Sequence, residues 1–186
     1  MRGEVGLYKL NQRVALTPAQ ARRCYNFRAM PDLTAVIADD LGQYCKRVSL
    51  DICKLVDTLS EDDFWRRPYP YGNSVGHLLL HLTGNLNYYI GAQIAGTGYV
   101  RNRPLEFSDS SRPPKDQVVK NFLEAVAMVQ NTLAKQSEAD LVSAYSAQGL
   151  EDAGDRFTAF LRCAAHLSHH TGQIIYLCKQ LQQARS

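Results

Sequence analysis

The chain has 186 residues, of which 45% are hydrophobic and 21% charged, values ordinary for a globular protein with one sizeable core. The formal charge of +3 is too small to favour nucleic acid as a partner, and no basic run alternates with aromatic residues. No apolar stretch approaches the roughly 18 to 20 residues that span a bilayer, so no membrane segment is expected.

Residues 1–29 differ in character from the rest of the chain. They contain six basic residues against a single acid, Glu4, and lack the apolar segment of a signal peptide. We interpret them as a basic N-terminal extension that contributes little to folding, or as the result of a start codon placed too early. The folded domain is expected over residues 30–186.

The cysteines indicate a reducing compartment. There are five of them, an odd number, and no two form a CxxC pair, so we expect free thiols in a cytoplasmic protein. Cys163 lies one turn before His166 and could reach a metal held there. A small buried apolar residue is the interpretation that we favour, because free cysteine is among the most buried residue types.

Apolar residues that recur every three or four positions predict four helices, over residues 32–58, 74–96, 113–136 and 155–182. Asn73 or Ser74 is placed to cap the second helix, and Pro113 and Pro114 suit the first turn of the third. Ser60 resembles the cap of a short extra turn after the first helix.

Four amphipathic helices of similar length, with no competing strand pattern and no internal repeat, predict an all-α four-helix bundle. The connection between the second and third helices, about fifteen residues, is long enough to cross the bundle. A parallel middle pair of helices is therefore allowed, although loop length alone does not decide the topology.

Two histidines interrupt the apolar stripe of the fourth helix. His166 and His170 are four residues apart, so both imidazoles project from one face of that helix. Burying them costs free energy unless a partner satisfies their nitrogens. A divalent metal ion shared with another helix would do so.

The second helix contains another HxxxH pair, His77 and His81. Its face continues through small and polar residues, including Gly84, which would leave open space beside the histidines for a metal and a substrate. Periodicity does not choose between His77 and His81. On the fourth helix, His169 points about 100° away from its neighbour His170 and does not easily join the ligands.

The segments NSVGHLLLHLTGN and HLSHHTGQI, with their separation and the four helices, resemble the DinB/YfiT-like superfamily of metal-binding bundles. That family shows a helix-two histidine followed by leucine, here His81, and a helix-four HxxxH, here His166 and His170. An Arg-Gly-Gln often follows in the family, and Thr171 stands here in place of the arginine. The resemblance covers about residues 31–182.

With this resemblance we expect an up-down-down-up bundle with a long crossover between the second and third helices. The resemblance implies His81, His166 and His170 as metal ligands, with His77 left out, and zinc or nickel as the ion. Several members of that family act as thiol S-transferases or thiol-dependent isomerases, so the resemblance implies a metal-dependent transferase that activates a small thiol. A non-catalytic metal-binding bundle and a metal-dependent hydrolase of a small molecule are the alternatives.

Three neutral imidazoles would leave a divalent ion its full charge and at least one open coordination position, as in catalytic sites. Such a site could generate hydroxide or deprotonate a bound thiol. No Glu or Asp accompanies the HxxxH motifs, which weighs against peptide hydrolysis. No catalytic residue is assigned from the sequence.

Several further side chains are candidates for supporting roles. Tyr88 and Tyr89 could supply a hydroxyl group, and Asn85 or Gln173 could orient an imidazole through a hydrogen bond. Four arginines in the connections could bind the carboxylates of a substrate: Arg66, Arg67, Arg101 and Arg103. Bundle tyrosines are more often structural and loop arginines more often solvated. A homodimer is expected mainly from the family resemblance, with Trp65, Tyr69 and Tyr71 as a contact patch.

Overall fold

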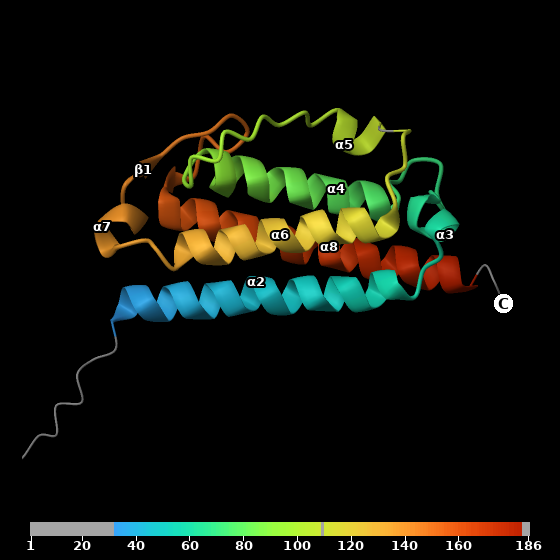
Figure 1. Cartoon of the computed structure of the whole chain (residues 1–186), viewed down its shortest axis with the longest axis horizontal. Helices are drawn as coiled ribbons and strands as arrows, with labels where there is room; N and C mark the ends of the chain where they lie inside the picture. Colours follow the sequence, from blue (N-terminus) through green and yellow to red (C-terminus); the bar gives the residue numbers. More distant parts are fainter. Residues whose placement is uncertain (1–31, 109, 184–186) are drawn as a thin grey trace, which may run out of the picture. The chain divides into compact units, whose positions relative to one another are not determined.

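The computed structural model describes residues 32–108 and 110–183, which form an all-α bundle (Figure 1). The four long helical segments are α2 (Leu33–Asp57), α4 (Val75–Leu86) with its π-helical continuation η1 (Asn87–Ala92), α6 (Lys115–Leu133) and α8 (Arg156–Gln183). The predicted fold class is therefore confirmed. The predicted extension, residues 1–29, lies outside the described residues.

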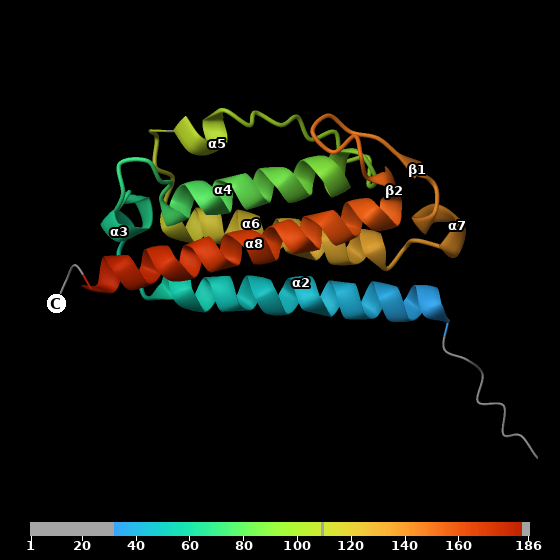
Figure 2. The same cartoon turned by 180° about the vertical axis from the view of Figure 1, so that it is seen from behind.

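The helices run in up-down-down-up order. In both views α2 and α8 point one way along the bundle, whereas α4 and α6 point the other way (Figures 1 and 2). The parallel pair α4 and α6 is joined by a connection that returns along the outside of α4 and contains the short helix α5 (Leu105–Ser108). This is the predicted long crossover.

Polar side chains begin the helices close to the predicted positions. The Asp32 carboxylate accepts a hydrogen bond from the Thr34 amide at the start of α2. The Ser74 hydroxyl accepts one from the His77 amide, so Ser74 rather than Asn73 caps α4. Ser60 caps the short helix α3 (Glu61–Trp65), as predicted.

The connections contain structure that periodicity did not predict. The short helix α7 (Glu138–Leu141) and an antiparallel pair of strands, β1 (Ala144–Tyr145) and β2 (Gly154–Asp155), lie between α6 and α8. Strands of two residues are too short to show alternation in a sequence. The second predicted helix also changes to π-helical geometry at Asn87, where Tyr88 and Tyr89 occur.

The interior of the described bundle is mostly apolar. The α8 residues Cys163, Ile174, Leu177 and Leu181 are buried, as their stripe predicted. Cys45, Cys53, Cys163 and Cys178 are all free thiols. Trp65 is 4% exposed and Tyr71 87%, so Trp65 belongs to the core and not to a surface patch. None of the described helices has the length and apolar character needed to cross a membrane.

Candidate metal centre

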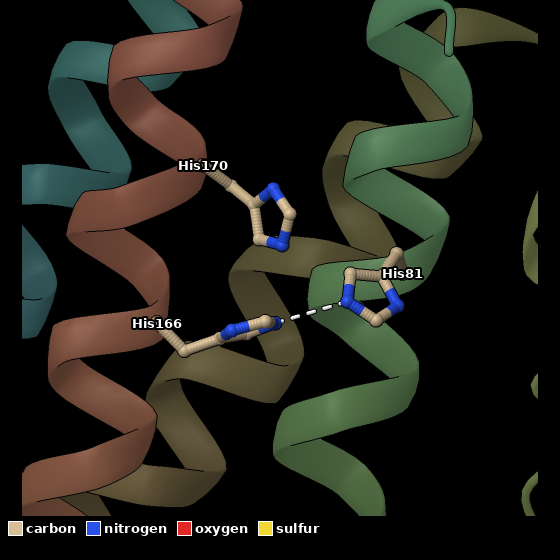
Figure 3. Close-up of side chains that lie close together, drawn as sticks. All are labelled: His81, His166 and His170. Carbon is tan, nitrogen blue, oxygen red and sulfur yellow. Dashed lines mark hydrogen bonds between the residues drawn. The ribbon is translucent and has the colours of Figure 1, made fainter. Parts of the chain in front are cut away.

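Three histidines from two helices meet inside the bundle (Figure 3). His81 comes from α4, and His166 and His170 come from α8; one ring nitrogen of each lies within 4.8 Å of those of the others. The Nε2 atoms of His81 and His166 are 2.9 Å apart. The ring centres of His166 and His170 are 4.4 Å apart, and each lies 5.0 Å from that of His81.

A carboxylate fixes the orientation of the His81 ring. Nδ1 of His81 lies 2.7 Å from Oε2 of Glu106. Burial raises the pKa of Glu106, but its hydrogen bonds to His81 and Arg101 and the charge of Arg101 outweigh this, so the pKa is lowered overall. Glu106 is therefore ionised and can only accept, which makes Nδ1 of His81 the donor. The lone pair of His81 is left on Nε2, the nitrogen that faces His166.

Arg101 binds the Glu106 carboxylate, and Gly84 leaves the space that this carboxylate occupies. Nε and one terminal nitrogen of Arg101 donate to the two carboxylate oxygens, at 2.6 and 2.9 Å. Arg101 also lies over the Tyr89 ring, 5.5 Å from its centre. A Cβ atom at Gly84 would collide with Oε1 of Glu106 and lie 2.9 Å from its Cδ. The small residue on α4 therefore makes room for the carboxylate beside His81.

An amide plays the corresponding part for His170. Its Nδ1 lies 2.6 Å from Oε1 of Gln173, a carbonyl oxygen that accepts, so Nδ1 donates and Nε2 keeps its lone pair. This is the orienting role that the sequence suggested for Gln173. Asn85, the other candidate, makes no such bond: its Oδ1 is buried without a hydrogen-bond partner among the described residues.

Burial keeps two of the imidazoles neutral. Desolvation makes the largest contribution and the neighbouring histidines the next largest, and together they lower the pKa of His166 to about 3. Desolvation also lowers the pKa of His170, against the opposing effect of its bond to Gln173. Neutral imidazoles are the form that binds a metal ion, so ligation would need no deprotonation of these two rings at neutral pH.

The geometry fits a small divalent ion. With nitrogen ligands at about 2.1 Å in tetrahedral arrangement, neighbouring nitrogens should be about 3.4 Å apart. The 2.9 Å separation of His81 and His166 and the 4.8 Å limit for the whole set bracket that value.

The other candidate ligands do not join this cluster. His77 is bonded through Nδ1 to the Ser74 hydroxyl and packs edge-on against Trp65. His169 is exposed, with its ring 5.1 Å from that of His170, as its rotation about the helix predicted. Cys163 is 3% exposed, and burial raises the pKa of its thiol to about 12, so it belongs to the apolar core.

A cavity of about 660 Å³ opens beside the cluster, bordered by His81 and His166. Asn85, Tyr88 and Tyr89 line it from α4 and η1. The Tyr89 hydroxyl donates to the Gln148 carbonyl at 3.3 Å, and burial raises its pKa, so it stays protonated. Tyr88 also borders the cavity with its side chain half-buried.

Glu106 and the role of Arg101 were missed from the sequence. The face through Gly84 was expected to leave space for metal and substrate, but the carboxylate of Glu106 occupies the position beside that glycine. Of the four loop arginines proposed to hold substrate carboxylates, Arg101 is bound to Glu106 and Arg66 to Asp63. The available signal was Gly84 itself, one turn from His81.

Comparison with known proteins gives a family. A sequence model described as "Protein of unknown function (DUF1572)" matches residues 39–185. The chain belongs to this family. The match takes in most of α2, all of α4, α6 and α8, and the three clustered histidines.

A solved structure supports the fold of this DUF1572 protein. The chain is similar to the "conserved protein of locus from Enterococcus faecalis", with a TM-score of 0.65 and 15% identity over 78% of this chain and 96% of that one. At that identity the likeness shows the fold alone. No curated protein matches the chain.

Proposed function

We propose that this DUF1572 protein is a divalent-metal-dependent enzyme of the DinB-like superfamily, which activates a small thiol for transfer. The observation that carries the proposal is the cluster of His81, His166 and His170 at the edge of a cavity. Three nitrogen ligands with space beside them are typical of catalytic metal sites, whereas structural sites are closed by four protein ligands.

Zinc or nickel is the ion that we propose, because both accept imidazole nitrogens. Bound there, the ion would supply Lewis acidity, which lowers the pKa of a thiol or water that completes its coordination. Glu106 and Gln173 support this role by keeping the Nε2 lone pairs of His81 and His170 directed into the cluster. The free thiols of the bundle support a cytoplasmic location.

In the proposed reaction a thiol loses its proton to solvent, and its sulfur then forms a bond to an electrophilic carbon. The leaving group departs from that carbon with the bonding electron pair. Tyr88 is placed at the cavity to hydrogen-bond the electrophile or the leaving group. Glu106 is not available as a general base, because Arg101 and His81 hold both of its oxygens.

One observation favours a second candidate. No Asp or Glu is among the described residues that line the cavity, so the chain supplies no carboxylate base there. A non-catalytic metal-binding bundle, in which the ion stabilises the core, is consistent with this. Hydrolysis of a small molecule would need a base from the substrate or the solvent.

The test starts from protein purified without a histidine tag. We expect about one zinc or nickel ion per chain by elemental analysis, and metal-dependent conjugation of small thiols to an electrophile such as 1-chloro-2,4-dinitrobenzene. Activity should disappear on chelation and return with the metal. Bound metal without activity towards any thiol would favour the non-catalytic bundle, and failure to bind metal would refute both.

A further inference from the structure

The charged side chains that line the cavity beside the histidines are all arginines. Arg101 and Arg103 come from the crossover, and Arg162 comes from α8, one turn before His166. None of the described lining residues carries a negative charge. A cavity lined by charges of one sign concentrates ligands of the other sign.

The three arginines differ in how far their charge is balanced. Arg101 is paired with Glu106, and both side chains are buried, 8% and 7% exposed. Arg162 is paired with Asp152 at 2.7 Å, but both side chains are open to solvent, 46% and 72% exposed. Arg103 lies over the Phe107 ring, 5.6 Å from its centre, and has no ion pair within the described part of the chain.

Arg103 and Arg162 are therefore the two groups free to engage a ligand. Exposed ion pairs such as that of Arg162 contribute little free energy, so a ligand can compete for the guanidinium. An arginine fork matches the two oxygens of a carboxylate. The ion pair between Arg101 and Glu106, in contrast, is buried and already orients His81.

A second observation points to a ligand in the same cavity. Asn85 lies one turn after His81, is 7% exposed and lines the cavity. Its Oδ1 has no hydrogen-bond partner among the described residues. Buried polar atoms are seldom left without partners, so this amide is suited to receive a donor from a bound molecule.

We propose that the cavity binds a carboxylate-bearing small molecule, with its carboxylate on Arg103 and Arg162 and an N–H or O–H group at Asn85. The other end of the molecule reaches His81 and His166. The inference rests on the proposed function in one respect only, namely that the end of the molecule near His81 and His166 carries a thiol. The arginine site itself is defined by the cavity and its charges.

The probes are mercaptosuccinate, 2-mercaptoethanol and succinate, added to protein loaded with Co²⁺. The thiolate-to-cobalt absorption band measures thiol binding, and calorimetry measures succinate binding. Mercaptosuccinate should bind at least about tenfold more tightly than 2-mercaptoethanol, the effect expected of one charge-assisted hydrogen bond. Arg103→Met and Arg162→Met should each remove most of that preference and weaken succinate binding, while leaving the Co²⁺ and 2-mercaptoethanol affinities unchanged.

Arg47→Met is the matched control, because Arg47 is an exposed arginine on α2 that does not line the cavity. It should leave all three probes unaffected. Equal binding of the two thiols, or succinate binding that neither cavity variant weakens, would overturn the carboxylate site. If neither thiol produces the band although Co²⁺ binds, thiol activation fails, and the succinate titrations still decide whether the arginine site exists.

Discussion

Replacing Gly84 by alanine should weaken metal binding by about 10- to 100-fold, the usual effect of losing a group that orients a metal-ligating histidine. Gly84 offers no ligand atom of its own. The effect would come through Glu106, because a methyl group at position 84 would collide with Oε1 of that carboxylate. The variant therefore tests the link between Glu106 and His81 without changing either residue.

The size of the effect follows from the geometry. The added carbon would lie 2.9 Å from Cδ of Glu106, about 0.6 Å less than the distance of about 3.5 Å that nonbonded atoms need, and its overlap with Oε1 would be larger. The carboxyl group must therefore withdraw by roughly 1 Å. The 2.7 Å bond to His81 would then exceed hydrogen-bond length. A 10- to 100-fold loss corresponds to about 1.4 to 2.7 kcal/mol of binding free energy.

Folding stability should respond differently from metal affinity. Alanine in a helix interior is favoured over glycine by about 1 kcal/mol, but hydrogen bonds to charged groups, here those of Glu106, contribute about 1.5 to 3 kcal/mol. We therefore expect the metal-free Gly84→Ala variant to lose about 0.5 to 2 kcal/mol of unfolding free energy.

Gly172→Ala is the matched control, because a Cβ at this helical glycine of α8 would meet no atom within 4 Å. It should gain a few tenths to about 1 kcal/mol of stability and keep its metal affinity. Metal affinity is measured by competition with a chromophoric chelator, and stability by urea unfolding in EDTA. If both Gly84→Ala and Glu106→Gln kept the metal affinity of the unaltered protein, the orienting role of Glu106 would be refuted.

Two further predictions concern the histidines. Alanine at His81, His166 or His170 should weaken binding of the divalent ion strongly, and alanine at His77 or His169 only slightly; equal losses in all five metal titrations would indicate non-specific binding. The pKa values of His166, about 3, and of His170 lie below the 6.5 of an unfolded histidine, so the unfolded chain binds more protons between those values. The unfolding free energy in EDTA should therefore fall as the pH drops from 7 to 5. If urea titrations gave the same unfolding free energy at every pH in that range, the lowered pKa values of these two histidines would be contradicted.

Local signals in the sequence were enough to predict the four helices. Caps such as Ser74 and Ser60 and the apolar stripe of α8 act within a few residues, so they can be recognised without tertiary information. The same holds for His166 and His170, because a spacing of four residues places both on one face of a helix. The choice of His81 over His77 depended on the family resemblance, since both occupy the same face of α4.

The orientation of His81 by Glu106 and Arg101 could not be predicted from local signals. Glu106 lies 25 residues from His81, in a helix of four residues, and nothing in its neighbourhood indicates that it turns inward. The connection also contains Arg101, whose pairing with Glu106 becomes visible only when the crossover is in place. The change to π-helical geometry at Asn87 likewise left no periodic pattern to detect.

The crossover joins the topology of the bundle to the chemistry of the cluster. Because α4 and α6 are parallel, the chain must return along the bundle before α6 begins, and it does so over α4 (Figure 1). On that path Phe107 packs against the His81 ring at 4.8 Å, and Arg67 donates to the Phe107 carbonyl at 2.6 Å. These contacts hold α5 where Glu106 meets Nδ1 of His81. A short hairpin between α4 and an antiparallel α6 would have no segment to place a carboxylate there, so the up-down-down-up order itself supplies the group that orients His81.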